Sequence, residues 1–309
     1  MDKKKYENVA VLIPCLNEEK TIGKVVTDFR TVLPGARIYV FDNNSSDNTS
    51  EAAKKNGATV ISSPRRGKGN VIKDMFRKIQ SDIYLLVDGD DTYPVEAAPR
   101  LIEEVEANGI DMVVGARMSS YTEKSFRTFH KFGNKMISAL ISMLFSVKIS
   151  DVLSGYRAFS SNIVKSIPVL SSRFEIETEL TLQTLTKGFS IKEVVIEYGE
   201  RPEGSVSKLN TFSDGFLILK AILMIFKDYR PLYFFSFLSI FFLLLSLMAG
   251  ILPILDYIYM QYVYHVPLAV LAAGNAIIAA LFAGIGIILD TVAKYQKENY
   301  ELFKRLLNK

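Results

Sequence analysis

The stretch "LLVDGDDTYP", residues 85–94, is a short apolar run that ends in a cluster of acids. Two leucines and a valine lead directly into Asp88, Asp90 and Asp91, and Pro94 closes the turn. Clustered carboxylates repel one another and raise one another's pKa unless a cation neutralises them. The stretch therefore predicts a buried strand whose carboxyl end delivers negative charge to a cation site.

The segments that precede this stretch alternate between strand and helix patterns. Short apolar runs are separated by amphipathic ones, which predicts an α/β fold with a mostly parallel sheet covered by helices on both faces. The expected strands are 8–16, 37–43, 58–63 and 82–89, and the expected helices are 20–32, 50–56 and 69–78.

Polar loops follow three of these expected strands. They are "PCLNEE" (14–19), "DNNSSDNT" (42–49) and "DGDDTYP" (88–94). Taken singly, each loop has an ordinary explanation as a helix cap or a turn. Ligands of parallel α/β sheets bind beyond the carboxyl ends of the strands, so three such loops together indicate one ligand site.

Asp88 and Asp90 are the expected metal ligands of that site. Gly89 separates them at a turn, so both carboxylates can reach one hard cation. Oxygen ligands select Mg²⁺ or Mn²⁺, and Mg²⁺ usually binds through one or two carboxylates plus substrate phosphates. The pair therefore predicts Mg²⁺ or Mn²⁺ and a diphosphate ligand.

Two long apolar runs lie near the C-terminus. The chain has 309 residues, 49% hydrophobic and 23% charged, with a net charge of +4. Residues 231–255 and 266–289 contain no charged side chain, and each run is long enough for a membrane-spanning helix of ~20 residues. A buried core hairpin is the alternative. Lys and Arg flank the pair but are absent from the connector 256–265, which predicts that both termini are cytoplasmic.

The segment 211–230 is apolar but carries Lys220, Lys227 and Arg230, which is typical of an interfacial helix; a core helix of the soluble domain is the alternative. The N-terminal apolar run is too short for a secretory signal, and the single Cys15 agrees with the cytosol. The expected organisation is a cytoplasmic domain (1–210), the interfacial helix (211–230), two spans (231–255 and 266–290) and a basic cytoplasmic tail (291–309).

Six motifs in this order resemble the inverting family 2 glycosyltransferases with the A-type, Rossmann-like nucleotide-sugar fold. They are "VLIPCLNEE", "VFDNNSSDNT", "RRGKGN", "LLVDGDDTYP", "VVGAR" and "DVLSGYRAF", and the likeness covers about residues 8–208. More narrowly, they are similar to the polyprenyl-phosphate glycosyltransferases, which include dolichyl-phosphate mannose synthase and bacterial membrane-anchored undecaprenyl-phosphate glucosyltransferases. The resemblance implies inverting transfer of a hexose to a polyprenyl phosphate at a bacterial plasma membrane. It implies no nucleic-acid partner and leaves a homo-oligomer open.

The resemblance also assigns donor-binding positions. Where the mannose synthases carry a metal-contacting glutamine, this chain has Thr92, and its "DDTYP" form is closer to the glucosyl enzymes, so a UDP-sugar is favoured over GDP-mannose. Arg65, Arg66 and Lys68 in "RRGKGN" are expected at the diphosphate, with a solvated basic turn as the alternative. The matched nucleoside positions are Pro14, Asn17, Glu18 and Asp42, and the matched metal positions are Asp88 and Asp90.

The acceptor side is expected to be basic, because arginine forks bind two phosphate oxygens at once. By resemblance the lipid phosphate is held by Arg117, Arg127 and Arg201, and the segment that contains Arg201 adds Ser205 and Lys208. A phosphomonoester is already anionic, with a second pKa of ~6, so a strong general base is dispensable. The expected catalytic set is Asp90, Asp151, Arg117, Arg127 and Arg201.

Some roles and some functions stay open at this point. Asp151 could orient Arg157 or the sugar, and either Glu177 or Glu179 is expected to line the site. Three other functions are compatible with parts of the pattern: a family 2 enzyme that glycosylates a hydroxyl acceptor, a metal-dependent nucleotidyltransferase, and a non-enzymatic membrane scaffold. Two apolar runs give a nucleotidyltransferase no evident advantage, and the intact aspartates argue against a scaffold.

Overall fold

The structure is a computed structural model that describes residues 5–117, 128–171, 176–199 and 223–307. The chain divides into two compact units, Met1–Ile218 and Leu219–Lys309. The strands are β1 Val9–Cys15, β2 Arg37–Asp42, β3 Thr59–Ser62, β4 Ile83–Leu86, β5 Met112–Arg117, β6 Arg157–Ser160 and β7 Ile191–Ile196. The helices of the first unit are α1 Glu19–Val32, α2 Thr49–Lys55, α3 Lys68–Lys78, the 3₁₀ turn η1 Val95–Ala97, α4 Ala98–Glu106, α5 Thr128–Phe145, α6 Ser161–Ser166 and α7 Ile176–Thr186.

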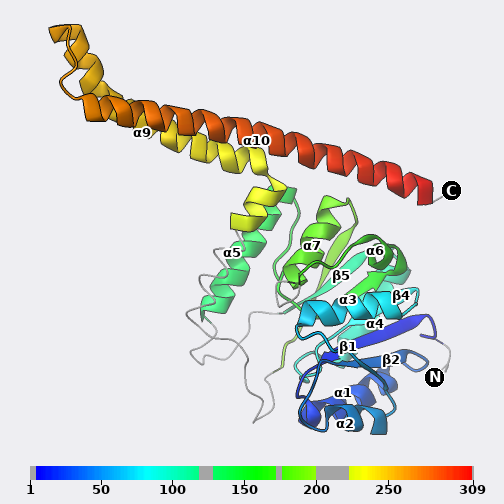
Figure 1. Cartoon of the computed structure of the whole chain (residues 1–309). Helices are drawn as coiled ribbons and strands as arrows, with labels where there is room; N and C mark the ends of the chain where they lie inside the picture. Colours follow the sequence, from blue (N-terminus) through cyan, green and yellow to red (C-terminus); the bar gives the residue numbers. More distant parts are fainter. Residues whose placement is uncertain (1–4, 118–127, 172–175, 200–222, 308–309) are drawn as a thin grey trace. The chain divides into compact units, whose positions relative to one another are not determined.

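The first unit is built on a seven-stranded sheet in the order β3-β2-β1-β4-β6-β5-β7 (Figure 1). All neighbouring strands are parallel except β6, which runs antiparallel to both β4 and β5. The expected mostly parallel α/β sheet is thus confirmed. The strand expected over 82–89 is shorter, since β4 ends at Leu86 and the acids lie in the loop beyond it.

Helices cover both faces of the sheet, which explains why β1 is apolar along its whole length. Alternate residues of β1, from Val9 to Ile13, join a core cluster with Ile22 and Phe29 of α1 and Leu101 of α4. The intervening residues of β1 are buried as well, and α3 contacts β1 from outside that cluster. A strand with both faces covered must be apolar at every position, so it shows no alternation with polar residues.

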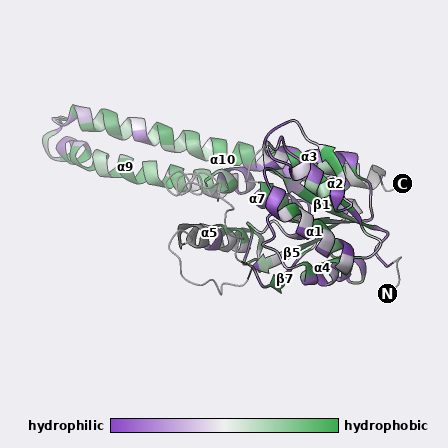
Figure 2. Cartoon of the chain, turned by 90° about the horizontal axis from the view of Figure 1, so that it is seen from below, coloured by the Kyte–Doolittle hydropathy of each residue, from purple (hydrophilic) through white to green (hydrophobic). Residues whose placement is uncertain are grey.

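The second unit is an antiparallel pair of long helices, α9 Pro231–Met260 and α10 Val266–Leu307. Ser239 Oγ donates to the carbonyl of Ala279 at 2.8 Å and Ser246 Oγ to that of Ala272 at 2.7 Å, which fixes their register. Both helices are long and apolar enough to cross a membrane, and only 11% of each apolar window is buried. Figure 2 shows hydrophobic residues, in green, along most of both helices.

The structure describes the secondary structure of parts of two further expected segments. Helix α10 continues to Leu307, so most of the basic tail expected over 291–309 is helical. Of the interfacial helix expected over 211–230, residues 223–229 are helical, with Leu223 and Met224 about half exposed, and 211–222 lie outside the described residues.

Candidate active site

One edge of the sheet gathers nearly all of the predicted site residues that the structure describes. Strands β1, β2, β3, β4, β5 and β7 share one direction, so their carboxyl ends lie at the same edge. Because β6 is antiparallel, the loop 151–156 that leads into it reaches this edge as well. The edge therefore combines the loops after β1, β2, β3 and β4 with Arg117 at the end of β5.

The loops after β1 and β2 are tied together by hydrogen bonds. Asn17 has a left-handed backbone (φ 55°), donates its amide N–H to Ser45 Oγ at 3.0 Å, and accepts from the Ser46 amide at 2.8 Å. Asp42, the last residue of β2, accepts from the Ser45 amide at 2.9 Å and from Ser50 Oγ at 2.6 Å. Asn17 and Asp42 thus belong to two hydrogen-bonded loops, the loop after β1 and the loop after β2, which together form a double loop.

The remaining nucleoside positions flank this double loop. Pro14 lies inside β1, in register with Phe41 of β2. The Glu18 amide donates to Thr49 Oγ1 at 2.9 Å, which links the start of α1 to the start of α2. Pro14 and Glu18 are thus adjacent to β2 and α2 respectively, and their nucleoside role stays a prediction.

Buried Asn43 connects β2 to the basic loop "PRRGKG" and was not among the site residues predicted from the sequence. Its Nδ2 donates to the carbonyls of Ser63 at 2.8 Å and Arg65 at 2.7 Å, and its Oδ1 accepts from the Gly67 amide at 2.8 Å. Gly67 has φ 115°, a conformation that favours glycine. An amide side chain directly after an apolar strand was the available signal. The connection holds the loop at the carboxyl edge and places Lys68 at the start of α3.

Lys68 lies between two carboxylates. Its Nζ is 2.6 Å from Asp88 Oδ1 and 2.6 Å from Glu177 Oε1, and only 11% of its side chain is exposed. Burial alone would lower the pKa of Lys68, but the charges of Asp88 and Glu177 outweigh it and hold that pKa well above its usual value. The predicted diphosphate-binding lysine is therefore a cation that already pairs with a predicted metal ligand.

Glu177 and Glu179 differ sharply in their surroundings. Glu177 is buried against Lys68, whereas Glu179 accepts from the backbone amides of Leu170 at 2.8 Å and Ser171 at 2.6 Å. Of the two acids left open by the sequence, Glu177 is the one at the carboxyl edge, and Glu179 stabilises the loop before α7.

The acids after β4 point to different partners. Asp90 is 4% exposed and accepts from Thr92 Oγ1 at 2.6 Å. Asp91 has φ 57° and pairs with Lys24 of α1 at 2.8 Å. Glycine is required at position 89, between Asp88 and Asp90, since a Cβ there would lie 2.7 Å from Cys15 Sγ. The loop therefore separates Asp91 from the pair of acids expected to bind a metal.

The donor set around Asp88 and Asp90 fits a hard divalent cation. Within residues 5–117, 128–171, 176–199 and 223–307, no group of three or more His, Cys, Asp and Glu side chains is arranged as a closed metal cage. Mg²⁺ does not require one, because it keeps several waters and takes further oxygens from substrate phosphates. Asp88 is 28% exposed and can offer a free oxygen to such an ion.

Gly155 leaves the space that Asp88 and Lys68 occupy. A Cβ at this position would lie 2.6 Å from Asp88 Oδ2 and 3.0 Å from Lys68 Nζ. The backbone is fixed there, because the Gly155 amide donates to the hydroxyl of buried Tyr93 at 2.9 Å.

Replacing Gly155 with Ala is expected to displace the Asp88 carboxylate and lower the affinity for divalent metal, with the domain still folded. The measurement is Mn²⁺ affinity by calorimetry on the full chain in detergent. Gly199→Ala is the matched control, since its nearest neighbour, the Thr92 carbonyl, lies at an ordinary 3.5 Å. Equal metal affinity in the two variants would show that Asp88 is not confined by Gly155.

Asp151 forms a bidentate ion pair with Arg117. Arg117 Nε lies 2.7 Å from Asp151 Oδ2 and its Nη2 lies 2.8 Å from Oδ1, while Asn134 Nδ2 donates to Oδ1 at 2.8 Å. Burial alone would raise the pKa of Asp151, but the hydrogen bonds and charge of Arg117 outweigh it and lower that pKa. The Arg117 guanidinium also lies over the Tyr198 ring, 5.3 Å from its centroid.

The suggestion that Asp151 orients Arg157 is not what the contacts show. Arg157 is fully buried and donates to the carbonyls of Ser154 at 2.9 Å and Val152 at 2.6 Å and to Thr181 Oγ1 at 2.9 Å. Its donors are directed at backbone and hydroxyl oxygens, so it stabilises the loop before β6. Asp151 orients Arg117 instead.

Part of the expected acceptor set cannot be compared with the structure. Arg127, Arg201, Ser205 and Lys208 lie outside the described residues. Arg65 and Arg66, expected near the diphosphate, are exposed on the basic loop after β3.

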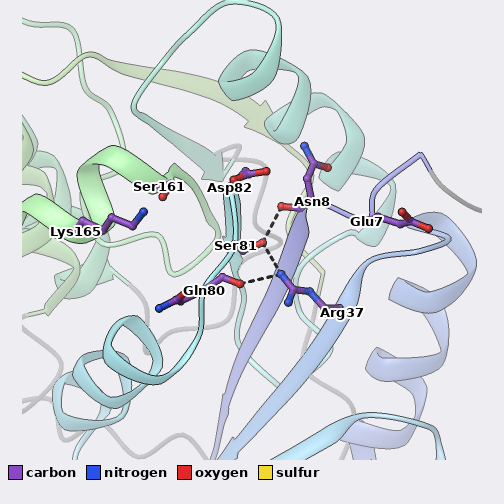
Figure 3. Close-up of a pocket in the computed structure, with 8 residues that line it drawn as sticks. All are labelled: Glu7, Asn8, Arg37, Gln80, Ser81, Asp82, Ser161 and Lys165. Carbon is purple, nitrogen blue, oxygen red and sulfur yellow. Dashed lines mark hydrogen bonds between the residues drawn. The ribbon is translucent and has the colours of Figure 1, made fainter. Parts of the chain in front are cut away.

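A hollow of about 490 Å³ lies at the opposite edge of the sheet, at the amino ends of β1, β2 and β4 (Figure 3). Arg37 there donates to the carbonyl of Gln80 at 2.8 Å and to Ser81 Oγ at 3.2 Å. Its charges are mixed, with Glu7, Asp82 and Lys165 also on its walls. The hollow receives none of the predicted site residues, and its hydrogen bonds join neighbouring strands.

Solved structures with a similar fold include glucosyl-3-phosphoglycerate synthase from Mycobacterium tuberculosis. Its complex with Mn²⁺, UDP and glucosyl-3-phosphoglycerate matches with a TM-score of 0.60 and 21% identity, covering 73% of this chain and 81% of that one. Its complex with Mg²⁺ and UDP matches with a TM-score of 0.59 and 20% identity, covering 73% and 80%. The fold is thus that of the A-type, nucleotide-sugar class of glycosyltransferases.

Sequence comparison defines the family. The Glycosyl transferase family 2 pattern matches residues 10–167, so the chain belongs to this family. Protein RfbJ of Shigella flexneri is 52% identical over 124 residues, covering 40% of this chain and 96% of that protein. Glycosyltransferase AglJ of Haloferax volcanii is 27% identical over 300 residues (96% and 98%), and the dolichyl-phosphate hexose transferase of the same organism is 29% identical over 225 residues (73% and 96%). The chain is therefore a family 2 glycosyltransferase with two apolar C-terminal helices.

Proposed function

We propose that this glycosyltransferase moves a hexose from a nucleotide diphosphate sugar, with a UDP-sugar favoured, to the phosphate of a polyprenyl phosphate. The observation that carries the proposal is the placement of Arg117, a cation of the kind that can bind phosphate, at the same sheet edge as Asp88 and Asp90, in a chain with two membrane-length helices. The similarity to a dolichyl-phosphate hexose transferase and the UDP complexes of the fold relatives support the acceptor and the donor.

The donor half of the site is assigned to the loops after β1 to β4. The double loop of Asn17 and Asp42, with Pro14 and Glu18, holds the nucleoside. Asp88 and Asp90 would hold a Mg²⁺ or Mn²⁺ ion, which would supply positive charge to offset the negative charge of the departing diphosphate. The basic loop after β3 adds cations on the same side.

The acceptor half is assigned to Arg117, whose fork Asp151 orients. A phosphate oxygen of the lipid attacks the anomeric carbon, the bond from that carbon to the diphosphate oxygen breaks, and the nucleotide leaves with the bonding electrons. Attack opposite the leaving group inverts the anomeric centre. The phosphate is already anionic, so no base is needed, which agrees with an Asp151 that is engaged by Arg117. Arg127, Arg201, Ser205 and Lys208 complete the proposed acceptor set.

The donor is tested by transfer of label from a panel of UDP- and GDP-sugars to undecaprenyl phosphate by the purified full chain in detergent. We expect chloroform-soluble label with one UDP-sugar, dependent on Mg²⁺ or Mn²⁺ and lost with chelator. Label from GDP-mannose alone would overturn the UDP preference. Activity that chelator leaves intact would overturn the metal assignment.

The two apolar helices are proposed to span a membrane as a hairpin, with the domain over 1–210, the interfacial helix over 211–230 and the basic tail 291–309 on the cytoplasmic side. Exposed apolar side chains along both helices support this arrangement, because hydrocarbon is the solvent that favours them.

This topology predicts opposite labelling of two cysteine variants by a membrane-impermeant maleimide. Tyr262→Cys, in the connector, is expected to react in intact cells, and Lys297→Cys, in the tail, only after permeabilisation. The native Cys15 is buried and gives little background. Reaction of Lys297→Cys in intact cells would contradict the proposed orientation.

A further inference from the structure

Glu177 is a buried acid that comes from far along the chain to the metal-binding loop. It lies in α7, is 5% exposed, and pairs with Lys68 of α3, which in turn pairs with Asp88 after β4. Side chains from three different elements therefore meet at one ammonium group, and α7 is distant in sequence from the other two. A buried ion pair costs desolvation energy and is weak evidence for a stabilising role, so its placement beside a proposed metal ligand needs another explanation.

The ammonium of Lys68 and a divalent cation would compete for the same carboxylate. Lys68 Nζ is 2.6 Å from Asp88 Oδ1, which is the distance of a strong charge-assisted contact. A metal ion that binds Asp88 weakens this contact and brings two cations close together. A buried lysine that lost its only partner would be left as an uncompensated charge, which is strongly unfavourable. Glu177 removes that difficulty, because it keeps Lys68 paired when Asp88 turns to the metal.

We propose that Glu177 is a positioning residue for metal and donor binding. Glu177 anchors Lys68, whose ammonium neutralises Asp88 before the donor arrives. When metal and diphosphate bind, the ammonium releases Asp88 and stays paired with Glu177. The ammonium then faces the diphosphate. The inference rests on the proposed function. Glu177 affects metal affinity through Lys68 and not through direct contact with the metal.

The proposal predicts opposite effects of two substitutions on Mn²⁺ affinity. Without Glu177, Lys68 depends on Asp88 alone, so Glu177→Gln is expected to weaken donor-free Mn²⁺ binding by roughly 5-fold or more, within the range of coupling between contacting residues. Lys68→Met removes the competing ammonium, so it is expected to strengthen donor-free Mn²⁺ binding. The same variant is expected to lose most of the extra Mn²⁺ affinity that UDP confers. A merely structural role would weaken binding in both variants.

The measurement is titration of Mn²⁺ by electron paramagnetic resonance with the full chain in detergent, with and without UDP. Glu179→Gln is the matched control, an acid on the same helix turned to backbone amides, and is expected to leave the affinity unchanged. The double variant Lys68→Met with Glu177→Gln removes both buried charges, which protects the test against misfolding of either single variant. It is expected to bind Mn²⁺ as Lys68→Met does.

The outcomes separate this inference from the proposed function. Unchanged affinity in Glu177→Gln, or the same weakening by Glu177→Gln with and without Lys68, would overturn the positioning role. Wild-type protein that binds no Mn²⁺ even with UDP would instead overturn the metal site itself, and with it the proposed donor chemistry.

Discussion

Replacing Asp90 with Asn is expected to lower the rate of sugar transfer by about 10²- to 10³-fold, the typical cost of removing one group that stabilises transition-state charge. Asn keeps the size of the side chain and an oxygen that can accept from Thr92 Oγ1, now 2.6 Å from Asp90 Oδ1, so the fold is expected to survive. What is lost is the negative charge that a divalent metal requires. The measurement is the initial rate of transfer to lipid phosphate at saturating metal.

Asp91→Asn is the matched control for this prediction. It is the same chemical change one residue along, at a carboxylate that pairs with Lys24 on α1. We expect near wild-type rates in Asp91→Asn at equal thermal stability. If both variants lost activity equally, the effect would come from the loop as a whole, and the assignment of Asp90 to the metal would fail.

The second large effect is expected from Arg117→Ala. Asp151 is 5% exposed, and removal of its partner leaves a buried charge with reduced compensation. We expect a loss of about 3 kcal/mol in the free energy of unfolding, because removing one partner of a buried ion pair exposes the desolvation cost of the other. For a domain of this size, such a loss lowers Tm by roughly 6–12 °C. Thermal unfolding in detergent measures it.

Two comparison variants separate structure from function at Arg117. Lys192→Ala breaks the exposed ion pair with Glu104, and its Tm is expected to stay near that of the wild type. Arg117→Lys keeps the positive charge but not the planar guanidinium. It is therefore expected to be more stable than Arg117→Ala, while its KM for lipid phosphate is higher than that of the wild type. A Tm of Arg117→Ala equal to that of Lys192→Ala would contradict the structural role, and an unchanged KM in Arg117→Lys would contradict the phosphate role.

Strands β5 and β7 were not among the expected strands, whereas β1 to β4 could be predicted because each is a local apolar pattern bounded by turn residues. The antiparallel strand β6 could not. It is four residues long, and its first residue, Arg157, is a buried cation that no hydrophobic pattern identifies. The Arg157 guanidinium donates hydrogen bonds to the carbonyls of Val152 and Ser154 and to the hydroxyl of Thr181. Only the folded chain brings these acceptors together.

The candidate site divides in the same way. Asn17, Asp42, Asp88 and Asp90 were predictable because the carboxyl ends of parallel strands share an edge. The pairing of Lys68 with Asp88 and Glu177 was not, because it depends on where α7 lies against α3, and the sequence shows no spacing that encodes it. The Arg117–Asp151 pair was hidden for the same reason, since each residue was assigned its own role.

The most direct test of the account compares two acceptors that share one polyprenyl chain, one ending in a phosphate and the other in a free hydroxyl. The purified full chain, a UDP-sugar and Mg²⁺ are incubated with each, and label in the lipid fraction is measured. We expect transfer to the phosphate and essentially none to the alcohol, because the proposed role of Arg117 is to bind a phosphate and Asp151, paired with Arg117, is not available as a base. Transfer to the alcohol at an equal or greater rate would contradict the proposed acceptor and establish a hydroxyl acceptor in its place.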